Sequence, residues 1–377
     1  MILDNFAESR GARKRILVLL PLLFILTGSP ALAQTWESTI RVGADWRSWS
    51  YETRDGDVSI QQLEVPVSVG YRRGPWSTLA EIAFVSNDSD LRGGGSADLS
   101  GLGRARLRAV RSLWDGRTLA FLETRFSNLV NRIDDDELQL LEILERRELS
   151  FPFTSADVGS QVRGGALTQI VRSSDLLVQA GAEFRWRAAF ELREDGLELD
   201  PGEELRLGAT LDHELSGVLW RHGLWREVFA GTDLDAEKAY TSGAQWRWES
   251  RLRKRLVGLE LGADLSILWS EDGTLESTLF LDDSSLRSGN RLVAGFWLTR
   301  PDPQWMWTAS LHTTQFRGYS GSLGHSGRIV PRLEIVRQLT TGQLELGVDA
   351  AFGTLREEES LTSVGLSLAW SLARGGS

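Results

Sequence analysis

The sequence contains no cysteine among its 377 residues. Disulfide bonds, thiolate metal ligands and thiol nucleophiles are therefore excluded. Histidine occurs four times without a metal-ligand cluster, and the glycine run at Gly93–Gly95 lacks the Lys-Ser/Thr pair of a phosphate-binding loop. The net charge of −10 argues against general nucleic-acid binding. We therefore expect no cofactor, no metal and no nucleic-acid partner.

Long apolar runs are also missing beyond the N-terminal segment, which excludes a helical membrane protein. At the N-terminus, basic residues between Arg10 and Arg15 precede an apolar core at 16–26 and the small-residue pattern Ala31-Leu32-Ala33. This order is typical of a cleaved export signal, and the core is short for a membrane anchor. We predict a signal peptide at 1–33 and a mature chain at 34–377.

The clearest pattern in the mature chain lies at residues 176–190, where two kinds of side chain alternate. Every even position there is apolar, and the odd positions include Gln179, Glu183, Arg185 and Arg187. A period of two predicts a β-strand with one apolar and one polar face. Strands in soluble proteins usually have about 5–6 residues, whereas a tilted strand crossing a bilayer needs roughly 9–11. We expect the even face to meet lipid and the odd face to meet water.

The same alternation recurs along the chain, as in the apolar odd positions from 257 to 269. The 15 tryptophans suit a membrane interface, where this side chain is favoured. We predict an all-β fold, a transmembrane antiparallel β-barrel of about 16 strands, with 14 as the alternative. The expected short turns all fall at one end of that barrel, and they lie at 74–75, 115–116, 172–175, 253–255, 301–304 and 340–342. A soluble β-sandwich or solenoid, which does not need this asymmetry, is the competing fold.

Residues 128–160 interrupt the alternation. Acidic residues at 134–137 precede a leucine-rich run that ends in two arginines, which suits a helix dipole. We predict a short amphipathic helix at about 135–148 within a long outer loop, where it either narrows the channel or caps the barrel mouth. The residues expected to form this helix surface are Leu138, Leu141, Leu144, Arg146 and Arg147.

Charged residues on the polar faces of the strands are the strongest functional signal. On membrane strands they are tolerable where they face water or protein. They could be a selectivity ladder for solutes, or paired charges that keep the lumen wet and the wall rigid. The candidate lumen-lining residues are Arg104, Arg106, Arg108, Glu183, Arg185, Arg187, Arg247, Glu249, Arg251, Asp264, Arg332 and Glu334.

Taken together, the export signal, the alternating strands and a last strand ending near Trp370 resemble Gram-negative outer-membrane β-barrels of the porin-like kind. The segment Gly101-Leu102-Gly103, which runs into 104–109, is similar to a strand of the phenol-degradation meta-pathway outer-membrane transporter-like family, with Arg104 where that family has an acidic residue. The resemblance implies outer-membrane lipid and the barrel-assembly machinery as partners. By analogy with general porins, the loop 128–160 takes the place of the loop that folds into the channel.

We predict a protein of the cell outer membrane that passes small solutes passively through a charged lumen, and not an enzyme. A lipid hydrolase embedded in the barrel is one alternative, because His312 shares a strand face with Ser310. Residues two apart on one face lie roughly 7 Å apart, too far for a direct hydrogen bond. A structural or adhesive surface barrel that uses its long outer loops is the other alternative.

Overall fold

The computed structural model describes eleven segments of the chain, and within them no helix is long and apolar enough to cross a membrane. The described segments are 36–53, 56–90, 95–126, 160–191, 198–234, 237–241, 243–271, 274–275, 290–317, 325–355 and 359–376. The predicted signal peptide 1–33 lies outside them, as does the loop 128–160 except for Ser160. The predicted helix residues Leu138, Leu141, Leu144, Arg146 and Arg147 therefore also lie outside the described residues.

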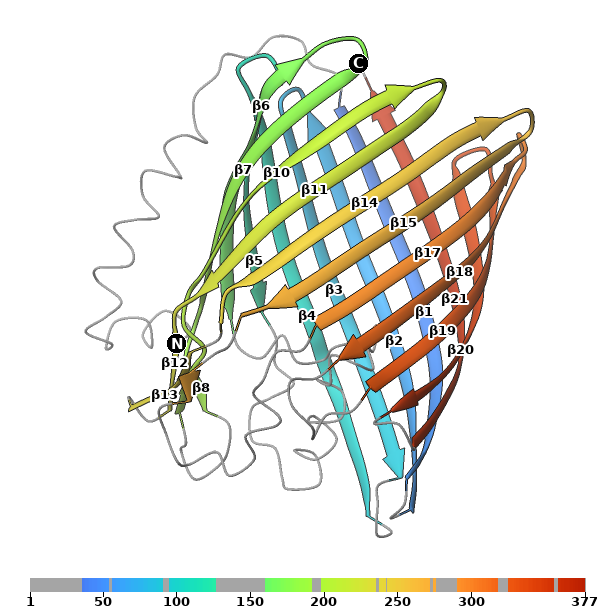
Figure 1. The fold of residues 1–377 in the computed structure, drawn as a ribbon. Helices are drawn as coiled ribbons and strands as arrows, with labels where there is room; N and C mark the ends of the chain where they lie inside the picture. Colours follow the sequence, from blue (N-terminus) through green and yellow to red (C-terminus); the bar gives the residue numbers. More distant parts are fainter. Residues whose placement is uncertain are drawn as a thin grey trace.

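Sixteen antiparallel strands form one closed barrel (Figure 1). The last strand, β21 (Glu359–Gly376), closes it by pairing with β1 (Trp36–Thr53). The strands between them are β2 (Gly56–Arg73), β3 (Trp76–Asp90), β4 (Ser96–Leu113), β5 (Thr118–Phe126), β6 (Gln161–Arg172), β7 (Leu176–Arg187), β10 (Glu204–Leu215), β11 (Val218–Phe229), β14 (Gln245–Leu256), β15 (Leu259–Ser270), β17 (Asn290–Pro301), β18 (Trp305–Arg317), β19 (His325–Gln338) and β20 (Gly342–Leu355). The predicted all-β barrel of 16 strands is confirmed, and the alternative of 14 is too few.

The outer face of the barrel is apolar, as the alternation predicts. Phe84, Leu107 and Phe296 project outward, and each is more than half exposed, at 56%, 55% and 53%. On β7, Phe184 is 48% exposed, whereas its neighbour Glu183 is 8% exposed and faces inward. A closed barrel has no unpaired strand edge, so its backbone can sit in hydrocarbon. This wall is that of an outer-membrane β-barrel, which confirms the predicted class and location.

Short turns join the strands at one end of the barrel. Between β10 and β11, Ser216 and Gly217 have φ values of 52° and 73°, the left-handed pair of a two-residue type I′ hairpin. The predicted turn at 253–255 is wrong, because β14 continues to Leu256 and the chain reverses at 257–258. Arg255 stays in the strand and contacts Glu260 on β15 at 3.1 Å.

At the opposite end, three successive connections pair with one another in a second small sheet. Its order is β16-β13-β12-β9-β8, and its segments lie between β7 and β10, β11 and β14, and β15 and β17 (Figure 1). The strands are β8 (Phe190–Glu191), β9 (Glu198–Asp200), β12 (Gly231–Leu234), β13 (Glu237–Thr241) and β16 (Thr274–Leu275). Backbone hydrogen bonds therefore tie these connections together beyond the barrel wall.

The barrel strands differ in length around the wall. β1, β2, β4 and β21 each have 18 residues, whereas β10, β11, β14 and β15 each have 12. Figure 1 shows β1, β2, β3 and β4 reaching past β5, β7 and β10 at the end away from the short turns. The inner face of these long strands is closely packed, and Trp49, Ile60 and Asn87 are fully buried. The wall is therefore taller on one side than on the other.

Candidate functional site

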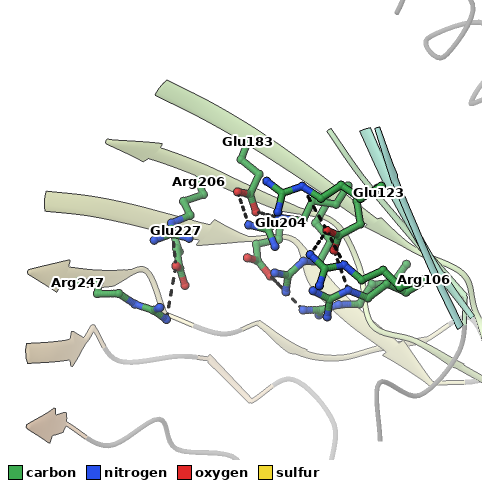
Figure 2. A network of polar contacts seen from close by, with 12 residues as sticks. Arg106, Glu123, Glu183, Glu204, Arg206, Glu227 and Arg247 are labelled. Carbon is green, nitrogen blue, oxygen red and sulfur yellow. Dashed lines mark hydrogen bonds and ion pairs between the residues drawn. The ribbon is translucent and has the colours of Figure 1, made fainter. Parts of the chain in front are cut away.

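A buried glutamate on β5 organises the charged inner face of the barrel. The side chain of Glu123 is 1% exposed and contacts arginines from two strands (Figure 2). Arg106 on β4 donates from Nε and Nη2 to Glu123 Oε2 at 3.0 and 2.7 Å. Arg125 donates from Nε to Oε1 at 2.7 Å, and Arg108 Nε lies 3.9 Å from Oε2. One carboxylate thus faces three guanidinium groups, which leaves a net positive charge at this part of the wall.

The pattern continues strand by strand around the wall, as Figure 2 shows. Arg163 on β6 donates to Glu183 on β7 at 2.6 Å. Glu204 on β10 accepts from both Arg185 and Arg187 of β7, each at 3.0 Å. The remaining contacts are Arg206–Glu227 at 3.3 Å, Arg247–Glu227 at 3.7 Å and Arg247–Glu249 at 3.9 Å. We call this set, from Arg106 on β4 to Glu249 on β14, the Arg–Glu ladder.

Seven of the twelve predicted lumen-lining residues belong to the ladder. They are Arg106, Arg108, Glu183, Arg185, Arg187, Arg247 and Glu249. Arg332 and Glu334 lie apart from it on β19, where they pair with each other at 2.9 Å. Arg251 and Asp264 face each other in register on β14 and β15 without an ion pair within the described residues. Arg104 lies on β4, and its side chain is outside the description.

The predicted lumen-lining residues did not include the ladder residues that complete these contacts, namely Glu123, Arg125, Arg163, Glu204, Arg206 and Glu227. Glu183 and Arg185 look like partners along one strand, but each pairs across to a neighbouring strand instead. Glu123 could have been predicted from the sequence, because it lies on the polar face of a strand that follows an arginine-rich strand. The register between two strands decides which arginine contacts which glutamate, and the sequence of one strand alone does not determine that register.

The wall formed by β1–β3 and β19–β21 has a different charge balance. A cavity of about 230 Å³ lies against it, lined by Asp45, Glu64, Glu81, Glu334 and Glu345 with Arg41 and Arg332. Arg47 nearby donates to Asp349 at 2.5 Å. Acidic residues outnumber basic ones in this cavity, whereas arginines outnumber glutamates in the ladder. The inner face therefore carries both signs of charge on separate parts of the wall.

Two inward-facing tryptophans pack against glycines, and each indole ring makes a cation–π contact with an arginine. The guanidinium of Arg206 lies 4.5 Å from the ring centroid of Trp225, a cation–π contact. A Cβ on Gly208 would overlap that ring, so the glycine lets the indole lie close to the wall. The same arrangement joins Arg251, Trp297 and Gly262. Flat aromatic side chains thus support guanidinium groups without filling the barrel.

The inner face shows no assembled catalytic group among the described residues. No group of three or more histidine, aspartate or glutamate side chains there could hold a metal ion. Ser310 and His312 lie on the inner face of β18, and no hydrogen bond of either side chain is present in the described part of the chain. Ser310 is in register with Trp297 and Arg332, and His312 with Gly295 and Val330. The wall can attract, orient and neutralise charged solutes.

No protein-family model matches the chain, and no curated protein matches it. Similar solved structures include OccK5 (OpdH) of Pseudomonas aeruginosa, at 9% identity and a TM-score of 0.47 over 89% of this chain and 98% of that one. In-vitro folded OmpT, an outer membrane protein of Vibrio cholerae, is 10% identical with a TM-score of 0.44, over 91% and 98%. A bacterial polysaccharide outer membrane secretin is 9% identical with a TM-score of 0.48, over 89% and 97%. The similarity of residues 101–109 to the phenol-degradation meta-pathway transporter-like family stays a prediction.

Proposed function

We propose that the chain is a passive outer-membrane channel that passes small solutes through a charged lumen. The observation that carries this proposal is a closed 16-stranded barrel whose inner face bears the Arg–Glu ladder. Barrels of 16–18 strands leave an aqueous channel, whereas about eight strands leave an interior filled by side chains. Ionised groups on the inner face of such a barrel are stable because water fills the space beside them.

The charges suit the passage of polar and charged solutes. Ion pairs and aromatic supports hold the long arginine side chains against the wall, which keeps the lumen open. Rings and rows of charged side chains set the selectivity of pores. The arginine surplus of the ladder favours anions along that wall, and the acidic cavity favours cations along the other. Small anions and small cations therefore each meet a part of the inner wall with the opposite charge.

The predicted helix-bearing loop 128–160 is proposed to regulate how wide this path is. In the strand order it connects β5 to β6, next to the ladder residues Glu123 and Arg163. A loop held there through its leucine face would narrow or cap the barrel. Deleting residues 134–148 should then raise single-channel conductance.

Single-channel recording in a planar bilayer tests the channel directly. The purified full-length protein should give stepwise, ohmic conductance. If neither the intact protein nor the variant lacking 134–148 conducts, the channel is refuted and an adhesive barrel or an enzyme becomes the better proposal. Hydrolysis of a lipid ester that His312→Ala abolishes would favour the enzyme.

A second test introduces a single cysteine, which is then the one site for a thiol reagent because the chain has no cysteine of its own. Ser266 faces inward on β15, in register with Glu249 and Val293, and its neighbour Leu265 faces outward. A charged, water-soluble thiol reagent should react with Ser266→Cys and lower its conductance. The same reagent should leave Leu265→Cys unchanged, because that position faces lipid. Reaction at Ser266→Cys without an effect on conductance would contradict a conducting inner face.

A further inference from the structure

Three ionisable side chains lie in register on the inner wall, outside the Arg–Glu ladder. Arg251 on β14 is opposite Asp264 on β15, Asp264 is opposite Gly295 on β17, and Gly295 is opposite His312 on β18. On β14, Arg251 lies four residues closer to the turn at 257–258 than the ladder residue Arg247. Arg251 is exposed to the barrel interior, and Asp264 and His312 are half-buried.

These three side chains differ from their neighbours because none forms a hydrogen bond or an ion pair in the described part of the chain. Two neighbouring arginines on the same wall, by contrast, are already paired. Arg221, in register with Arg251, makes a two-point contact with Asp212 at 2.7 and 2.5 Å. Arg253 contacts Glu260 at 3.8 Å. Arg251 and Asp264 thus keep their charges available to the lumen.

The guanidinium of Arg251 is held in place by an aromatic support. It lies 5.7 Å from the ring centroid of Trp297, which projects from β17 toward β15. The Trp297 ring in turn lies over Gly262, where any Cβ would overlap it. A positioned cation that lacks a carboxylate partner is a ready site for an anionic group of a ligand.

Asp264 and His312 converge over the glycine between them. A Cβ on Gly295 would lie 2.6 Å from Asp264 Oδ1 and 2.6 Å from His312 Nδ1. The carboxylate oxygen and the ring nitrogen are therefore separated by no more than twice that distance. A carboxylate and an unprotonated ring nitrogen are both acceptors, so together they suit a donor that carries several N–H groups, such as an ammonium.

We propose that Arg251, Asp264 and His312 form a solute-binding subsite for small zwitterions whose two charges are a few ångströms apart, as in an α-amino acid. The carboxylate of the solute binds Arg251, and its ammonium lies between Asp264 and His312. This inference rests on the proposed channel function and names one class of solute that the channel recognises.

Uptake of labelled L-alanine into proteoliposomes tests the subsite, with KCl conductance measured in parallel. Uptake should saturate with concentration. Unlabelled L-alanine should compete better than L-lactate, which lacks the ammonium, or L-alaninamide, which lacks the carboxylate. Loss of one charge-assisted contact should raise the half-saturation concentration about tenfold in Arg251→Gln and in Asp264→Asn. Arg253→Gln, which removes the same charge two residues along β14 and outside the ladder, should not.

Gly295→Ala provides a test without any change of charge. Its methyl group would push Asp264 and His312 apart, so it should also raise the half-saturation concentration. Stepwise KCl conductance in each variant shows that the barrel has folded. If the wild type conducts but its alanine uptake does not saturate, or if Arg251→Gln and Asp264→Asn give the same half-saturation concentration as Arg253→Gln, the subsite is overturned and the channel stays intact. Absence of both conductance and uptake in the wild type overturns the channel itself.

Discussion

Replacing Glu123 by glutamine should destabilise the barrel strongly, although it changes few atoms. The side chain is 1% exposed and accepts hydrogen bonds from Arg106 and Arg125, each with a contact of 2.7 Å. The substitution removes the charge that both guanidinium groups share. They remain 20% and 23% exposed, so water recovers part of their solvation.

The magnitude follows from these contacts. A hydrogen bond to a charged group contributes about 1.5–3 kcal/mol, and removing one partner of a buried pair costs about 3–5 kcal/mol. Because both arginines keep some water and the glutamine oxygen can still accept hydrogen bonds from one of them, we expect a loss of about 2–3 kcal/mol at this site. Arg108, at 3.9 Å and 40% exposed, adds little.

Urea unfolding of the protein in lipid vesicles measures this loss, and a gel-mobility shift on heating reports the folded barrel. Glu345→Gln is the matched control, because Glu345 also contacts an arginine, Arg41, at 2.6 Å on the inner wall. That arginine is 55% exposed, so the control should lose less than about 1 kcal/mol. Removing Arg106 as well should restore part of the stability of Glu123→Gln. Equal losses for Glu123→Gln and Glu345→Gln would refute the role of burial.

Two further substitutions test other parts of the wall. Gly262→Ala should destabilise the barrel by about 1–3 kcal/mol in the same unfolding assay, because its methyl group overlaps the Trp297 ring. Gly327→Ala, which has a single neighbouring atom at 3.7 Å, should not, and equal effects would contradict the packing argument. Truncation after residue 370 should lower the yield of heat-modifiable barrel, because 371–376 pair with 36–41 of β1. An unchanged yield would show that this part of the seam is dispensable.

The fold was largely predictable because one face of each strand meets lipid and enforces alternation. Prediction weakened where an apolar side chain points inward. One example is β11, which runs from Val218 to Phe229. There Trp225 faces inward over Gly208, so apolar residues occur on both faces. Polar side chains also point inward on β3, where Asn87 is buried and accepts a hydrogen bond from Gln62 Nε2 at 2.8 Å.

The last strand was also predicted too short, with an end near Trp370. Residues beyond it lack a clear alternation but continue in register with β1 as far as Trp36. For the charged wall, the sequence identified which residues are ionised and which of them lie on the same face of a strand. It did not identify their partners, since Glu204 pairs with Arg185 and Arg187 through the register of β7 and β10. That register depends on the whole barrel, so no local pattern encodes it.

The unequal strand lengths give the barrel an oblique mouth. β1, β2, β4 and β21 have six more residues than β10, β11, β14 and β15, so the tall side extends farther by about 20 Å along the strand at 3.3 Å per residue. This exceeds the Debye length of about 8 Å at physiological ionic strength, so charges on the two rims do not sense each other. In the proposed channel, the ladder residues of β7, β10 and β14 therefore act on an approaching ion independently of charges on the tall rim.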